Sequence, residues 1–114
     1  MSDCLFCKFA SGEIPTNKVF EDDTVLAFRD IAPQAPTHVL IIPKKHIPSV
    51  QALSAEDAAL WLHMMEVAQN VARSEGVAES GYRIVSNVGS DAGQSVPHLH
   101  LHLLGGRNME WPPG

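Results

Sequence analysis

Residues 95–104 read Ser-Val-Pro-His-Leu-His-Leu-His-Leu-Leu, and the rest of the chain is organised around them. It holds three of the chain's six histidines, at every second position, with leucines between and after them. Such alternation has the period of a β-strand, in which successive side chains point to opposite faces of the sheet. We therefore predict that His98, His100 and His102 share one face, with neighbours about 6.5–7 Å apart along the strand. The leucines between them should face the hydrophobic core.

The histidine face of this strand indicates a reactive site. Histidine is a nucleophile and a proton carrier near neutral pH, and it is also a common metal ligand. A strand whose second face only meets solvent more often carries Thr, Val or Lys. The residues alone leave two non-catalytic alternatives open, a solvated polar face and a cluster of hydrogen-bonded core histidines. Strict repetition over three positions favours chemistry.

Length and composition indicate an ordinary globular protein. The 114 residues suit one domain, over residues 1–114, that is just long enough to bury a core. Hydrophobic residues make up 45% and charged residues 18%, which argues against disorder. The net charge of −5 argues against a nucleic-acid polymer as partner, because phosphate backbones are bound by clustered Lys and Arg.

The apolar segments of the chain are short. None reaches the roughly 18 residues of a membrane span, and the N-terminus lacks the apolar core of a signal peptide. We therefore expect a cytoplasmic protein without a membrane partner. The two cysteines, Cys4 and Cys7, are not expected to form a structural disulfide in that compartment.

The remaining segments predict a mixed order of helices and strands. We expect a short helix over 4–11, strands over 18–21, 24–30, 37–43 and 82–88, and a long helix that follows residue 54. Asp3 can cap the short helix, and Gly12 can end it in the left-handed conformation. Ser54 and Asp57 have the form of a capping box, and Gly76 stops the long helix. Its apolar stripe is wider than one sheet face needs, which favours another subunit as a second partner.

A glycine-rich loop over 89–95 leads directly into the histidines. Backbone N–H groups in such loops can converge on an anion, and Ser95 adds a hydroxyl. A plain hairpin connection is the alternative. The position of the loop beside the histidines favours an anion site.

The segment His98-Leu99-His100-Leu101-His102, followed by two leucines, resembles the signature of the histidine triad (HIT) family. The similarity covers nearly the whole chain and includes residues 20–23, 26–28, 30–31, 33–38 and 42–46. Residues 93–96 and the tail over 105–114 resemble the Hint branch, the nucleoside phosphoramidases. The resemblance implies an α+β HIT fold, with a five-stranded antiparallel sheet, one long helix and a short N-terminal helix. It also implies homodimers joined through the central strand and the long helix.

The resemblance implies a mechanism as well. His100 matches the family's nucleophile, which would attack the α-phosphorus of a purine nucleoside 5′-phosphoramidate and displace the amine. Water would then hydrolyse the nucleotidyl-histidine. The implied catalytic residues are His100, His102, His38 and Ser95. No catalytic cofactor is implied, since histidines and backbone dipoles stabilise the transferring group.

The same resemblance implies an AMP-like nucleotide site. Its residues would be Leu5, Phe6, Phe9, Phe28, Asp30, Ile31, Asn87, Gly93, Ser95, Val96, His100 and His102. The apolar members of this set match the base pocket. Asp30 matches the carboxylate that binds the ribose hydroxyls, and Asn87 and Gly93 match phosphate contacts.

Two features depart from the usual Hint pattern. Pro97 stands where an aromatic residue is often found, and it can alter how the histidine strand begins. Cys4-x-x-Cys7 resembles bacterial relatives that bind zinc through two cysteines and two histidines, here Cys4, Cys7, His46 and His98. A Cys₂His₂ set suits tetrahedral structural zinc and would leave His100 free. Reduced cysteines that only fill the helix face are the alternative, and a thioredoxin-like role lacks its βαβ pattern.

Other functions of the same chain stay open at this point. One is hydrolysis of dinucleoside polyphosphates or nucleotidyl transfer, with the same nucleophile and another leaving group. Another is a zinc-stabilised nucleotide-binding scaffold dimer. The tail through Trp111 favours the phosphoramidase, because in Hint-like proteins it lies beside the other subunit's active site.

Overall fold

A computed structural model describes residues 3–114. Its elements are α1 (Leu5–Ser11), β1 (Lys18–Glu21), β2 (Val25–Arg29), β3 (Thr37–Pro43), the 3₁₀ turns η1 (Val50–Ala52) and η2 (Ala55–Asp57), α2 (Ala58–Ser74), β4 (Tyr82–Val85) and β5 (Leu101–Gly105). The strands form one sheet in the order β1-β2-β3-β5-β4, and every neighbouring pair is antiparallel. The predicted α+β fold, with one long helix and a short N-terminal helix, is confirmed.

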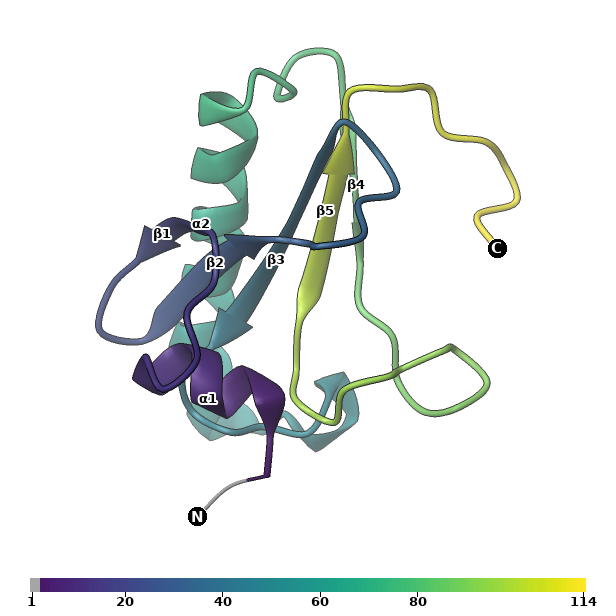
Figure 1. Cartoon of the computed structure of the whole chain (residues 1–114). Coiled ribbons are helices and arrows are strands. Elements are labelled where there is room, and N and C mark those ends of the chain that lie inside the picture. Colours follow the sequence, from purple (N-terminus) through teal and green to yellow (C-terminus); the bar gives the residue numbers. More distant parts are fainter. Residues whose placement is uncertain (1–2) are drawn as a thin grey trace.

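The central strand β3 is buried along its whole length, because both of its faces are covered. Val39 and Ile41 join the larger core, which includes the buried face of α2. Leu40 and Ile42 join a smaller core that includes Phe6 of α1. In Figure 1, α2 runs behind β2 and β3, and α1 lies at the end of the sheet where β3 finishes and β5 begins. A strand between two such layers is mostly apolar, and the polar exceptions in β3 are Thr37 and His38 at its start.

The long helix α2 has the predicted boundaries, with one difference at its start. A 3₁₀ turn precedes it, and the Asp57 carboxylate accepts the Ser54 N–H at 3.1 Å, as a capping box does. Gly76 follows the helix with a φ of 76°, a left-handed conformation that glycine adopts at little cost. Over residues 3–114, no helix is long and apolar enough to cross a bilayer.

The cap of the short helix α1 differs from the prediction. Cys4, not Asp3, is the N-cap residue, and its Sγ accepts the Cys7 N–H at 3.3 Å. The sulfur lies where a serine oxygen would, three residues before its donor, so the cap and the Cys-x-x-Cys spacing coincide. Gly12 ends the helix with a φ of 83°, as predicted.

The histidine segment is strand-like only in its second half. Its strand β5 begins at Leu101, and β4 ends at Val85 instead of residue 88. Before β5, Leu99 donates its N–H to the Ile47 carbonyl at 2.6 Å, so the chain leaves the sheet ladder for a loop partner. Even so, Leu99, Leu101 and Leu103 all lie in the core that includes α2, as the alternation predicts.

Pro97 sits in the bend that precedes this segment. The His98 N–H donates to the Val96 carbonyl at 2.8 Å, which makes Pro97 the central residue of a three-residue turn. Proline suits this position, because its ring holds φ near the value that an inverse γ-turn requires. The strand starts at Leu101, four residues after Pro97, and the alternation of side chains is intact.

Candidate active site and metal centre

Five of the six histidines lie in one row on the face of the sheet that carries α1. The ring centroids of His46 and His98 are 5.0 Å apart, those of His100 and His102 are 5.1 Å apart, and those of His102 and His38 are 5.1 Å apart. Phe6 of α1 bridges the row, with its ring 5.9 Å from that of His98 and 5.0 Å from that of His100. The row thus begins at the end of β3, passes the histidine segment and ends at the start of β3.

The ring of His100 is oriented by its own chain. Its Nδ1 lies 2.7 Å from the carbonyl oxygen of His98. A carbonyl only accepts, so the hydrogen-bond network places the proton of the neutral ring on Nδ1. The lone pair is then on Nε2, which is the form of imidazole that attacks an electrophile. His100 is 95% buried, so little of its surface meets solvent.

A second hydrogen-bond chain fixes the proton of His102. The Gln34 N–H donates to His38 Nδ1 at 3.0 Å, so the proton of neutral His38 is on Nε2. His38 Nε2 lies 2.9 Å from His102 Nδ1 and donates to it. The proton of neutral His102 is therefore on its own Nε2. This arrangement presents an N–H donor on His102 next to the lone pair of His100.

Burial keeps the imidazole rings of His38 and His102 uncharged at neutral pH. Burial, together with the neighbouring His100 and His38 rings, lowers the pKa of His102 to about 4. Burial also lowers the pKa of His38, although Asp30 opposes this with an oxygen 3.5 Å from His38 Nε2. A neutral His102 donates a hydrogen bond to an anion without acting as a strong acid.

The apolar residues expected around a base divide into two groups. Phe6, Phe9 and Phe28 pack together, with ring centroids 5.1–5.9 Å apart. Leu5 is 42% exposed and Ile31 is 99% exposed, so neither is part of that cluster. The three aromatic rings thus form one cluster, and the two aliphatic side chains are exposed to solvent.

The loop over 89–95 uses several of its own N–H groups. Gly93 donates to the Ser90 carbonyl and Gln94 donates to the Gly89 carbonyl, each at 3.0 Å. The N–H of Gly93 is thus engaged within the loop. The exposed Ser95 and the half-buried Val96, which follow these residues, are therefore the candidates for contact with an anion.

Gln94 holds this loop in place, a role that the motif analysis missed. Its side-chain oxygen accepts the Gly89 N–H at 2.9 Å, and its side-chain nitrogen donates to the Pro48 carbonyl at 2.8 Å and to the Val96 carbonyl at 3.1 Å. One amide therefore closes the loop and ties it to the segment after β3. The sequence signal was an amide at the end of a glycine-rich loop, where it can satisfy donors and acceptors together.

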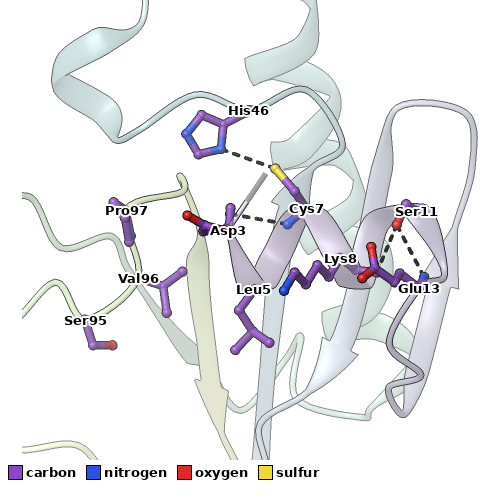
Figure 2. Close-up of a pocket in the computed structure, with 11 residues that line it drawn as sticks. Asp3, Leu5, Cys7, Lys8, Ser11, Glu13, His46, Ser95, Val96 and Pro97 are labelled. Carbon is purple, nitrogen blue, oxygen red and sulfur yellow. Dashed lines mark hydrogen bonds between the residues drawn. The ribbon is translucent and has the colours of Figure 1, made fainter. Parts of the chain in front are cut away.

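An open groove of about 930 Å³ runs between α1 and the segment 95–97 (Figure 2). Its walls include Leu5 and Lys8 of α1, Ser95 and the Cys7–His46 pair. Figure 2 shows His46 reaching toward Cys7 at one side of the groove and Ser95 at another. Solvent therefore reaches the Cys/His group and the catalytic serine candidate from the same side.

The four predicted metal ligands come together beside this groove. One ligand atom from each of Cys4, Cys7, His46 and His98 lies within 4.8 Å of the others. Cys4 Sγ lies 3.2 Å from His98 Nδ1, and Cys7 Sγ lies 3.3 Å from His46 Nδ1 and 3.5 Å from His98 Nδ1. The two Nδ1 atoms are 3.2 Å apart. Tetrahedral zinc at ordinary bond lengths would place two nitrogens about 3.3 Å apart and a nitrogen and a sulfur about 3.6 Å apart. The donor set and its spacing fit a tetrahedral ion.

The hydrogen bond that His98 makes on the side away from the cysteines also supports a metal site. Its Nε2 lies 2.8 Å from the Pro43 carbonyl, so the proton is on Nε2 and the lone pair is on Nδ1, toward the cluster. Metal-binding histidines commonly donate their second nitrogen in this way. The ring is 0% exposed, so its orientation is set by packing as well.

A second group, Asp30, His38 and His102, also has ligand atoms within 4.8 Å of one another. Here His38 Nδ1 already accepts the Gln34 N–H, so Nε2 carries a proton and has no lone pair for a metal. Of the two groups found among residues 3–114, only the Cys/His group presents lone pairs to a common centre.

Comparison with known proteins agrees with this geometry. A HIT domain model matches residues 11–109. The chain is 50% identical over 107 residues to a purine nucleoside phosphoramidase of Escherichia coli K12, covering 94% of this chain and 90% of the relative. It is 51% identical over 112 residues to a HIT-like protein of Synechococcus elongatus, covering 98% of this chain and 97% of that one.

A solved structure of similar fold comes from Legionella pneumophila Philadelphia 1 and is described as a HIT family hydrolase. It superposes with a TM-score of 0.97 at 58% identity, covering 98% of this chain and 100% of the other. A HIT family hydrolase from Clostridium thermocellum superposes with a TM-score of 0.93 at 45% identity, covering 96% of each chain. The histidine row, the sheet that carries it and these matches together show that the chain belongs to the HIT family.

Proposed function

We propose that this chain is a hydrolase that cleaves the P–N bond of purine nucleoside 5′-phosphoramidates, with His100 as the nucleophile. The observation that carries the proposal is the Nδ1–H of His100 bound to the His98 carbonyl at 2.7 Å, because it leaves the Nε2 lone pair for phosphorus. The similarity to a relative named purine nucleoside phosphoramidase supports the choice of substrate class.

The reaction proceeds in two steps, and each forms one bond to phosphorus and breaks another. His100 Nε2 forms a bond to the α-phosphorus while the P–N bond to the amine breaks, and the amine takes one proton from water through the Ser95 hydroxyl. Water then adds to phosphorus, the bond to His100 breaks, and a proton returns to solvent. The Nε2–H of His102 donates to a phosphate oxygen in both steps, which stabilises the charge that develops there.

The nucleoside occupies the aromatic wall beside this centre. The cluster of Phe6, Phe9 and Phe28 packs against the base, and Leu5 and Ile31 cover its rim. Asp30 keeps one carboxylate oxygen on the Ala32 N–H at 2.8 Å and offers the other to the ribose hydroxyls. Asn87, Ser95 and Val96 complete the phosphate contacts, while Gly93 shapes the loop.

The Cys/His group holds one structural zinc ion in this proposal. The ion would be bound by Cys4, Cys7, His46 and His98, and it would pin α1 to the end of the sheet. The ion would link α1 to the sheet and would take no part in catalysis, because His100 is not one of its ligands. A reducing cytoplasmic location, which keeps both thiols available as ligands, belongs to the same proposal.

We also propose that the chain, one HIT domain over residues 1–114, works as a homodimer. Leu62 of α2 is 60% exposed, which supports a partner on that helix. The backbone of β3 is paired on both sides, so two sheets cannot join through it as the family resemblance implied. Of the two edge strands, β1 and β4, we favour β4 for that contact, because Arg83 of β4 donates to the Glu110 carbonyl of the tail at 3.1 Å.

Purified protein tests the function directly. Adenosine 5′-phosphoramidate and diadenosine polyphosphate are offered side by side, and turnover of the first should exceed that of the second. His100→Ala should lose nearly all turnover while it still binds AMP, and trapping should find a nucleotidyl adduct on His100 of the unaltered protein. Near-normal turnover by His100→Ala would rule out the mechanism, faster cleavage of the polyphosphate would replace the substrate class, and AMP binding without turnover would favour a scaffold.

A further inference from the structure

The proposed nucleophile lies just beyond the end of the sheet. The β4–β5 ladder ends at the pair Val85 and His102, and the β3–β5 ladder ends at the pair Ile41 and Leu101. Both ladders that flank β5 have thus stopped before His100. Its backbone needs another support if its ring is to meet phosphorus in a fixed place.

A side chain supplies this support where the ladder stops. Ser86 directly follows β4, and its hydroxyl donates to the His100 carbonyl oxygen at 2.9 Å. The bond joins the same two segments that the ladder joins one residue earlier. The ring of His100 is held separately, by the His98 carbonyl. His100 is therefore fixed at its main chain by one bond and at its side chain by another.

We propose that Ser86 is a positioning residue for His100. The inference rests on the proposed function, because it concerns the approach of His100 Nε2 to phosphorus. Ser86 acts through the main chain, since its hydroxyl donates to the His100 carbonyl and not to the imidazole ring. Attack on phosphorus demands a narrow range of distance and direction, and a displacement of about 1 Å can cost up to about 10²-fold in rate. Loss of one hydrogen bond of this kind should lower kcat about fivefold.

The chain offers a matched pair of variants for the test. Ser86→Thr keeps the hydroxyl, and Ser86→Val has nearly the same shape without it. Ser86 is only half-buried and follows a strand, so both β-branched side chains suit the site. We expect kcat for adenosine phosphoramidate to fall about fivefold in Ser86→Val and Ser86→Ala and to stay within about twofold in Ser86→Thr. KM and the AMP affinity should stay within about twofold in all three, because the nucleotide contacts are elsewhere.

A spectroscopic measurement separates positioning from general destabilisation. In protein with ¹⁵N-labelled histidine, the Nδ1–H proton of His100 should exchange faster with solvent in Ser86→Ala and Ser86→Val than in Ser86→Thr, while the Tm values of Thr and Val variants agree. Equal kcat values for Ser86→Thr and Ser86→Val, or an unchanged kcat in Ser86→Ala, would overturn the inference. His100→Ala is the reference: its near-normal turnover would remove the proposed function, whereas an inactive His100→Ala beside a fully active Ser86→Ala would remove only the role of Ser86.

Discussion

Two groups of histidines flank His100, and they are built for different chemistry. At one end, His98 donates its Nε2–H to the Pro43 carbonyl, which turns its lone pair toward two cysteines and His46. At the other end, His38 accepts the Gln34 N–H, which turns its proton toward His102. The residue types overlap, and both groups are compact enough to hold an ion. In each group a backbone group binds one ring nitrogen of a histidine. A carbonyl there leaves the lone pair on the other nitrogen for a metal ion, whereas an N–H there leaves a proton on the other nitrogen for the next histidine.

His98 contacts both the Cys/His group and His100, but through different parts of the residue. Its ring belongs to the Cys/His group, while its carbonyl holds the Nδ1–H of His100. The separation predicts that each group can be broken by itself. Damage to the Cys/His group can reach His100 through the backbone of His98 and through Phe6 of α1, whose ring lies 5.0 Å from that of His100.

The largest expected effect follows from removal of both thiols. Cys4→Ser with Cys7→Ser should abolish binding of about one zinc ion per chain and lower the Tm by about 10 °C, because α1 loses its tie to the sheet. Activity should fall less than stability does, since His100 and His102 are not ligands. Metal analysis, thermal unfolding and turnover at a temperature well below the new Tm measure the three quantities.

Zinc-replete expression and free-thiol titration provide the control for this prediction. Unaltered protein without zinc, with both thiols freely titratable, would contradict the metal centre. His98 would then be only a hydrogen-bonded member of the triad.

A smaller effect is expected from breaking the proton chain at its outer member. His38→Phe keeps a buried ring but removes the donor to His102 Nδ1, so His102 is free to carry its proton on the wrong nitrogen. We expect kcat to fall about tenfold, with zinc content unchanged. His38→Gln is the matched control, because its amide N–H can still donate to His102 and should restore part of kcat. Loss of zinc in His38→Phe would show that the two groups are not independent.

The smallest expected effect concerns stability and pH. The pKa of His102 is lowered to about 4 in the fold, from 6.5 for an ordinary imidazole. Between these values the unfolded chain binds more protons than the folded chain, so the free energy of unfolding falls as the pH drops through this window. His102→Gln should therefore lose about 7 °C less in Tm than the unaltered protein between about pH 7 and pH 5.

His63 offers a control of opposite sign for this measurement. Its Nε2 lies 2.6 Å from Asp22 Oδ2, and that hydrogen bond raises its pKa. Its stabilising effect is complete below the unfolded pKa and is lost as the pH rises through the folded one. His63→Gln should thus be destabilised at pH 5 and unchanged at high pH. Equal pH profiles for His102→Gln and the unaltered protein would contradict a buried, neutral His102.

Much of the fold could be predicted from local patterns. Alternation placed Leu99, Leu101 and Leu103 in the core, and the apolar run of β3 indicated a covered strand. Strand ends were predicted less well, because β4 and β5 stop where Ser86 and Leu99 find partners other than the ladder. The cap of α1 was also missed, since a cysteine sulfur there serves as the acceptor.

The reactive side chains and their spacing can be read from the sequence: a histidine at every second position, two cysteines three residues apart, and a glycine-rich loop before the triad. The role of each histidine depends on contacts that form only in the folded protein. The deciding partners are backbone groups, the Pro43 carbonyl, the Gln34 N–H and the His98 carbonyl. Every residue carries such groups whatever its side chain, so residue types along the chain do not reveal which of them will face a ring nitrogen.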